Sequence, residues 1–97
     1  MNFEWDEEKN QINVEKNRIV FNDAKDIFQS ARLTAIDSRR DYGETRKISI
    51  GTIGPQVCVV EYTERAGVKR IISARKANQR ERKHFYEYIE KEKTEEN

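Results

Sequence analysis

Arginine, lysine, glutamate and tyrosine side chains gather at the ends of three predicted strands. The candidate catalytic residues are Glu44, Arg46, Arg65, Arg75 and Lys76, and the candidate RNA-binding residues are Arg39, Tyr42, Tyr62, Lys69 and Arg70. Cleavage of RNA at its own 2′-hydroxyl needs a base, an acid and cations that stabilise the pentacoordinate phosphorane, but no metal. In this chemistry Glu44 is the candidate base, and Lys76 or Tyr42 is the candidate acid. The three arginines would bind the phosphate and stabilise the transition state.

Two other interpretations fit the same residues. The planar fork of arginine binds phosphate in a bidentate manner, and Tyr42 or Tyr62 could stack on an unpaired base, so the surface could bind single-stranded RNA without cutting it. Charged residues at strand ends are also often plain solvated surface, worth under about 1 kcal/mol per ion pair. Composition and spacing leave all three interpretations open.

The sequence lacks the motifs of the common cofactor and metal sites. It has no glycine-rich phosphate loop, no cysteine–histidine metal spacing, no serine elbow and no acidic calcium loop. We therefore expect no metal and no cofactor. His84, the single histidine, lies beside the predicted core stripe of the last helix, and Cys58 lies among valines, where a small buried hydrophobe is expected. A single cysteine excludes an internal disulfide and is typical of a reducing cytosol.

The charges divide the chain into three segments. The 97 residues predict one domain with a modest core, since 35% are hydrophobic and 38% charged. Residues 39–83 contain 12 Lys/Arg and 5 Asp/Glu. Residues 1–38 contain 5 Lys/Arg and 8 Asp/Glu, and residues 84–97 contain 2 Lys/Arg and 5 Asp/Glu. A basic centre of this kind can bind a polyanion while the net charge stays at +1. No apolar run is long enough to span a membrane and no signal peptide is recognisable, so we expect a soluble cytoplasmic protein.

Hydrophobic periodicity predicts an α+β protein with the element order β-α-α-β-β-β-β-α. The strands are expected at 2–6, 33–38, 45–51, 56–63 and 68–75, and the helices at about 6–16, from about 22, and from about 77. Short glycine-containing turns join the last four strands into an antiparallel meander, in which "VCVV" is central and covered on both faces. We expect one domain at 1–90, followed by a flexible acidic tail at 91–97.

Meander geometry predicts that the strand ends meet. Alternate turns share an edge, so the turn at 39–46 and the turn at 64–67 should lie together. Period-two alternation places Glu44, Arg46, Ile48 and Ile50 on one face, and Lys69, Ile71, Ser73 and Arg75 on one face of the last strand. With helices on one side of the sheet, the other face would be concave and positive.

Several segments, "FEWDEEKNQINVEKN", "VFNDAKDIF", "DSRRDYGETRKISIG", "VVEYTER" and "RIISARKANQRERKHFYE", resemble the BrnT family, the toxin half of a bacterial type II toxin–antitoxin pair. The resemblance runs from Phe3 to about Glu87. It implies a RelE-like fold with an antiparallel sheet packed against helices, and ribonuclease activity that halts translation. It also implies a BrnA-like antitoxin with a ribbon-helix-helix DNA-binding part, a 2:2 complex, and repression of the operon through the antitoxin.

Carried over by position, the family motifs fall on Asp37, Arg39, Tyr42, Gly43, Glu44 and Arg46, on Tyr62, Thr63, Glu64 and Arg65, and on Arg70, Ser73, Ala74, Arg75, Lys76 and Ala77. One departure is clear, because Lys16, Asn17 and Arg18 stand where the family usually has Lys-His-Gly. We expect Asn17 to take the left-handed conformation of the missing glycine. The missing histidine keeps a non-catalytic binding module as the alternative. The antitoxin is expected to cover the basic face near Arg46 and Arg75 with an acidic segment.

Overall fold

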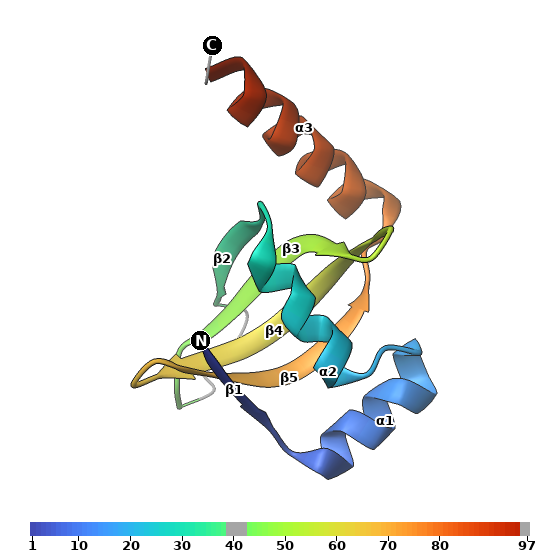
Figure 1. The fold of residues 1–97 in the computed structure, drawn as a ribbon, viewed down its shortest axis with the longest axis vertical. Coiled ribbons are helices and arrows are strands. Elements are labelled where there is room, and N and C mark those ends of the chain that lie inside the picture. The colour runs from blue at the N-terminus through green and yellow to red at the C-terminus, as the bar shows by residue number, and fades with distance from the viewer. Residues whose placement is uncertain (39–42, 96–97) are drawn as a thin grey trace.

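The computed structural model describes residues 1–38 and 43–95, with side chains through Lys93. The elements are β1 (Asn2–Trp5), α1 (Glu7–Asn17), α2 (Phe21–Ala24), the 3-10 helix η1 (Lys25–Gln29), β2 (Leu33–Asp37), β3 (Arg46–Ile53), β4 (Gln56–Arg65), β5 (Val68–Lys76) and α3 (Gln79–Glu95). Figure 1 shows the helices arranged around one twisted sheet. The predicted α+β class is confirmed. No helix in the described part of the chain is long and apolar enough to cross a membrane.

The sheet is mixed, with the strand order β1-β5-β4-β3-β2. Strands β2 to β5 form the predicted antiparallel meander, but β1 pairs in parallel with β5, Glu4 lying opposite Arg70. The wholly antiparallel sheet expected from the sequence is therefore wrong in this one pairing. A short first strand followed by helices can join either edge in either direction, and its own residues do not specify which.

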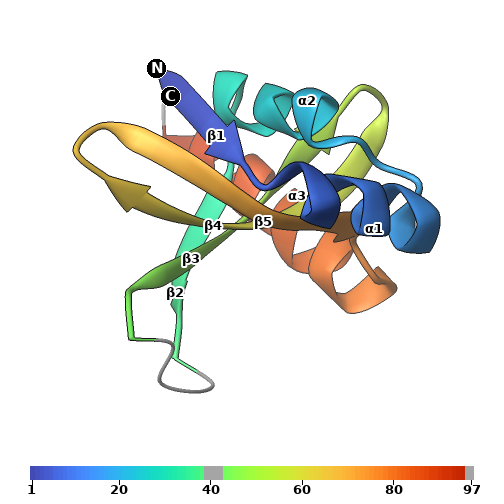
Figure 2. The ribbon, with the colours of Figure 1, turned by 90° about the horizontal axis from the view of Figure 1, so that it is seen from below.

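Strand β4 is central, as its apolar run predicted, and its side chains alternate between two layers. Cys58, Val60 and Tyr62 point to the covered face, over which α1, α2 and η1 pack. Val57 and Val59 point to the opposite face, which we call the open face, and pack against Phe85 of α3. Figure 2 shows α1 and α2 on one side of the sheet and α3 on the other. In Figure 1, α3 projects beyond the sheet.

A bulge in β5 changes which residues share a face. Tyr62 of β4 pairs with Ile71, but the preceding Glu61 pairs with Ser73, so Ile72 is an extra residue. The inserted residue reverses the alternation, because each further residue now points to the other side. Consequently Lys69 and Ile71 lie on the covered face, whereas Ser73 and Arg75 lie on the open face. The predicted common face for these four residues is wrong.

Helix α1 is held to the sheet through a buried amide. Beyond the end of β1, the edge of β5 has no strand beside it among the described residues. There the Asn13 side chain donates to the carbonyl of Ala74 at 2.9 Å and accepts from its N–H at 3.2 Å. The same amide donates to the carbonyl of Ile19 at 2.8 Å. Asn13 thus replaces a neighbouring strand at this edge.

Helix α1 begins at a side-chain cap and ends at an unusual residue. The Asp6 carboxylate accepts from the backbone N–H of Glu8 at 2.8 Å, as its position predicted. At the other end Arg18, not Asn17, is left-handed, with φ at 62°, and its N–H donates to the Val14 carbonyl. The left-handed conformation expected at Asn17 is therefore wrong, and Arg18 takes instead a conformation that glycine adopts without strain.

Helix α3 begins at a reciprocal cap and extends to Glu95. The Glu81 N–H donates to the Asn78 side chain at 2.8 Å, and the Asn78 N–H donates to the Glu81 carboxylate at 2.9 Å. Phe85 is buried and Ile89 packs on the same cluster. The helix thus continues past residue 90, and the division into a domain at 1–90 and a tail at 91–97 stays a prediction.

Candidate active site

A pocket forms where the described part of the β2–β3 turn meets the β4–β5 turn. Its volume is about 430 Å³, and we call it the turn pocket. Its described lining residues are Glu4, Gly43, Glu44, Thr45, Thr63, Glu64, Arg65, Val68 and Arg70. The prediction that these two turns share one edge of the sheet is therefore confirmed. Arg39 and Tyr42 lie outside the described residues.

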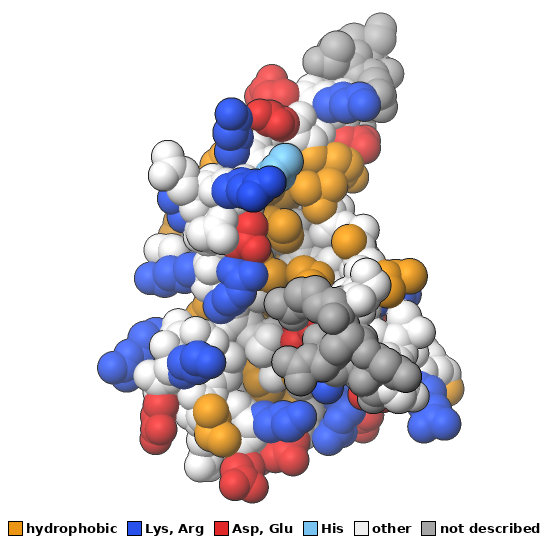
Figure 3. All heavy atoms as spheres, turned by 180° about the vertical axis from the view of Figure 1, so that it is seen from behind, with side chains coloured by type: hydrophobic (Ala, Val, Ile, Leu, Met, Phe, Trp, Pro, Cys, Tyr) orange, Lys and Arg blue, Asp and Glu red, His pale blue; other side chains and the backbone are white. Residues whose placement is uncertain are grey.

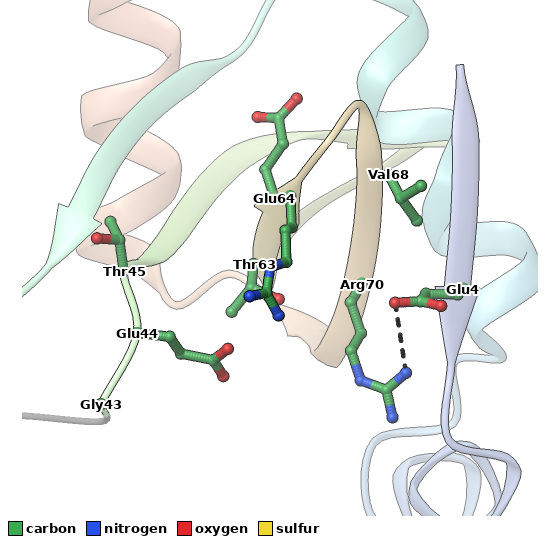
Figure 4. A pocket seen from close by; sticks show the side chains of 9 residues that line it. Glu4, Gly43, Glu44, Thr45, Thr63, Glu64, Val68 and Arg70 are labelled. Carbon is green, nitrogen blue, oxygen red and sulfur yellow. Dashed lines mark ion pairs between the residues drawn. The ribbon is translucent and has the colours of Figure 1, made fainter.

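Opposite charges face each other across the turn pocket. In Figure 4 the Glu44 carboxylate enters from the β2–β3 side and the Arg70 guanidinium from β5. Arg70 also contacts Glu4 of β1 at 3.6 Å. Glu44 and Arg65 make no ion pair with any residue that the structure describes. Both side chains are therefore available to a ligand.

A row of polar residues crosses the open face beside the turn pocket. The row contains one residue from each strand, and each is the register partner of the next. From β2 to β1 these residues are Asp37, Arg46, Thr63, Arg70 and Glu4. Arg46 also lies 3.8 Å from the Glu61 carboxylate, and the side chains of both are mostly buried, 22% and 14% exposed. The charge of Arg46 is thus balanced within the sheet. Arg65 and Arg70, on the pocket wall, present the more accessible guanidinium groups.

Arg75 and Lys76 lie at the other end of β5. Arg75 lies five positions along β5 from Arg70, which corresponds to about 16 Å. The Arg75 fork donates two hydrogen bonds of 2.8 Å to the Glu81 carboxylate, and these bonds hold the pKa of Glu81 below its usual value. Lys76 lies near Cys58 and lines a separate pocket of about 170 Å³. The structure therefore does not bring Arg75 and Lys76 to Glu44.

Tyr62 and Lys69 are buried on the covered face. Tyr62 is 2% exposed, shares a hydrogen bond of 3.0 Å with the Ser49 hydroxyl, and packs edge-on against Phe28. Lys69 is 6% exposed, lies near both aromatic rings, and donates to Glu64 at 2.7 Å. A buried ring cannot stack on a base, and this ammonium group is already bound. The structure therefore does not place Tyr62 or Lys69 in the turn pocket, and for Lys69 the reason is the bulge.

Glu64 fixes the strand ends that carry the turn pocket. Its carboxylate accepts from Lys69 of β5 at 2.7 Å and from Lys47 of β3 at 3.2 Å. These two hydrogen bonds lower the pKa of Glu64 from its ordinary value of 4.5. In Figure 4 the Glu64 carboxylate points away from Glu44 and Arg70. Its function is to join three strands just behind Arg65.

Sequence reasoning missed Glu4 as part of the site. Glu4 reaches the turn pocket only because β1 runs parallel to β5 and pairs with it at Arg70. The alternation of Phe3, Glu4 and Trp5 did contain a signal. The two aromatic residues pack on the covered-face core, so the glutamate between them must point to the open face.

Comparison with known proteins identifies the class. The family described as "Ribonuclease toxin, BrnT, of type II toxin-antitoxin system" matches residues 5–81. The crystal structure of the Brucella abortus ribonuclease toxin BrnT superposes with a TM-score of 0.63 at 27% identity, over 81% of this chain and 99% of that chain. A search of curated proteins finds no match.

The fold and the family match thus define a ribonuclease toxin of a type II toxin–antitoxin system, a class that has an antitoxin as its partner. The chain belongs to the BrnT family.

Proposed function

We propose that this BrnT-family toxin cleaves RNA without a metal ion in the turn pocket. The observation that carries the proposal is the convergence of the Glu44 carboxylate with Arg65 and Arg70 on one open cavity of about 430 Å³. Neither Glu44 nor Arg65 is neutralised by a described neighbour. Glu44 supplies the base and the two arginines supply the cations that phosphodiester cleavage requires.

The reaction uses the RNA's own 2′-hydroxyl as the nucleophile. Glu44 takes the 2′-hydroxyl proton while the 2′-oxygen forms a bond to the adjacent phosphorus. The P–O5′ bond breaks with its electron pair on O5′, which takes a proton from the acid. The products are a 2′,3′-cyclic phosphate and a 5′-hydroxyl. Arg65 and Arg70 bind the non-bridging oxygens, whose negative charge grows in the transition state.

The acid in this scheme is Tyr42, the neighbour of Gly43 in the sequence. Lys76 is not assigned to the turn pocket, because it lies at the opposite end of β5. Arg46 supports the wall from the open face, where Glu61 and the paired Asp37 surround it. Glu4 restrains Arg70 in the absence of RNA and releases it to phosphate.

We infer the biological setting from the resemblance to BrnT toxins. RNA cleavage stops translation in the cytoplasm until a BrnA-like antitoxin with a ribbon-helix-helix part binds the toxin in a 2:2 complex. Operator DNA is contacted only through that antitoxin.

The alternative is a non-catalytic binding module, suggested by Asn17 in place of the family's histidine. However, Asn17 donates to Asn13 at 3.0 Å and lines a different, shallow pocket with Ser73. Asn17 does not line the turn pocket, so its substitution leaves Glu44, Arg65 and Arg70 in place, which favours the enzyme.

Induced expression in a bacterial host tests the proposal. The wild type should arrest growth and degrade total RNA, and Arg65→Ala and Arg70→Ala should each relieve both effects. Arg80→Ala, a change of an exposed arginine on α3, is the matched control and should remain toxic. If Arg65→Ala and Arg70→Ala were as toxic as the wild type, the turn pocket would not be the site. A folded, harmless wild type would favour the binding module.

A further inference from the structure

Strand β2 is an unprotected edge of the sheet. It pairs with β3 on one side, and the structure describes no strand on its other side. Edge strands usually carry lysine, proline or a bulge that prevents pairing with another chain. Strand β2, "LTAID", has no lysine, proline or bulge, and its one charged residue, Asp37, is buried at the end of the strand. Its register with β3 is regular, and Ile36 is 66% exposed. Such an edge is suited to pair with an added strand.

An apolar groove lies beside this edge on the open face. It has a volume of about 290 Å³ between β2, β3 and α3, and its walls include Leu33, Ala35, Ile48, Ile50, Glu81 and His84. Figure 3 shows apolar side chains gathered next to the histidine. A strand placed along β2 would direct alternate side chains into this groove, and the others over Ile36.

The charges around the groove favour an acidic occupant. The only carboxylate in the described lining, Glu81, is already held by two hydrogen bonds from Arg75. Arg80 and Lys91 lie on the same side of α3 as His84, at helical spacings of four and seven residues, and the exposed acid Glu87 lies between them. A second copy of this chain would place two such cationic rims together, which is unfavourable.

We propose that the antitoxin binds this groove with an extended acidic segment that adds a strand to β2. Its apolar side chains fill the space between α3 and β3, and its carboxylates face Arg80 and Lys91. The Asp37 end of β2 begins the row that leads through Arg46 to the turn pocket. The segment is therefore positioned to continue over that pocket, and this masking effect rests on the proposed function.

Hydrogen exchange of the free toxin and of its complex with the purified cognate antitoxin tests the added strand. The outward-pointing amides of residues 33–37 should exchange rapidly in the free toxin and slowly in the complex. Unchanged exchange at 33–37 in a saturated complex would overturn the proposal. Protection of these amides in a dimer of the toxin alone would also overturn it, since a second copy would then be the occupant.

Substitutions test the groove and the sign of its charge. Ala35→Glu should weaken antitoxin binding by at least about tenfold, and Ala35→Lys should weaken it less, because the partner is acidic. Ile12→Glu, at an exposed apolar position on α1, is the matched control and should bind as the wild type does. Equal affinity of Ala35→Glu and the wild type would refute the proposal. Each variant is also assayed for RNA cleavage without antitoxin, which Ala35→Glu should retain, so that failure of the proposed function is seen separately.

Discussion

The buried amide of Asn13 provides the sharpest test of how the fold is stabilised. Asn13 is 5% exposed and connects α1 to the backbone of Ile19, shortly after the helix, and to that of Ala74 in β5, far away in the sequence. Replacement by alanine removes the partner of the Ile19 carbonyl and the partner of both backbone groups of Ala74. We therefore expect Asn13→Ala to destabilise the protein far more than its loss of volume would suggest.

The magnitude follows from the groups left unpaired. A buried backbone group that loses its partner costs about 1–3 kcal/mol. Three unpaired groups would set a high upper limit on the loss of stability. However, a shallow pocket borders Asn13, and water entering it would pair with some of these groups. We expect a loss of about 3 kcal/mol, which lowers Tm by roughly 10–20 °C in a domain of this size.

Denaturant titration of the wild type, Asn13→Ala and Asn17→Ala measures the loss. Asn17→Ala is the matched control, because it removes only the 3.0 Å bond to Asn13 and should cost about 1 kcal/mol or less. If Asn13→Ala lost under about 1 kcal/mol, or if both variants lost the same amount, the assigned function of this amide would be incorrect.

Three further predictions concern stability. Gly51→Ala should cost about 1–3 kcal/mol in the free energy of unfolding, because its new methyl group would lie 2.8 Å from Cγ1 of Ile27. Arg18→Gly should add about 0.5–1 kcal/mol, because it relieves a left-handed arginine. The lowered pKa of Glu64 stabilises the fold above about pH 4.5, and this contribution is lost as the pH falls through the folded-state pKa. Glu64→Gln should therefore destabilise at pH 7 and approach the wild type in acid.

Thermal and denaturant unfolding check all three predictions. An unchanged Gly51→Ala would mean that the close approach at this strand is relieved by small movements. A destabilised Arg18→Gly would show that the arginine side chain contributes more than its backbone strain removes. A constant difference between Glu64→Gln and the wild type from pH 7 to pH 3 would contradict the assigned ion pairs.

The elements were predictable from the sequence because their signals are local. Period-two alternation located the strands, and the apolar run in β4 placed it at the centre with both faces covered. Glycine-containing turns predicted the meander, and with it the meeting of Glu44 with the turn that holds Arg65. These features depend on neighbouring residues only, and the structure confirms them.

The errors concern long-range pairing. Neither the parallel pairing of β1 with β5 nor the bulge at Ile72 can be recognised from the residues of that strand alone. The bulge by itself turns Lys69 from the open face to the covered face, where it is buried. The burial of Asn13 depends on where β1 ends, which is again non-local. The position of Arg75 could have been foreseen, because in a meander the end of the last strand lies opposite the turn that begins it.

Cleavage of RNA by the purified protein tests the central claim most directly. With EDTA present, the wild type should release fragments that end in a 2′,3′-cyclic phosphate, and Arg65→Ala should reduce kcat by about 100-fold or more. Arg75→Ala should retain activity per folded molecule, because Arg75 lies about 16 Å from Arg70 along β5. Full activity of Arg65→Ala, or loss of activity in folded Arg75→Ala, would contradict the assignment of catalysis to the turn pocket. Cleavage abolished by EDTA would contradict the metal-independent mechanism.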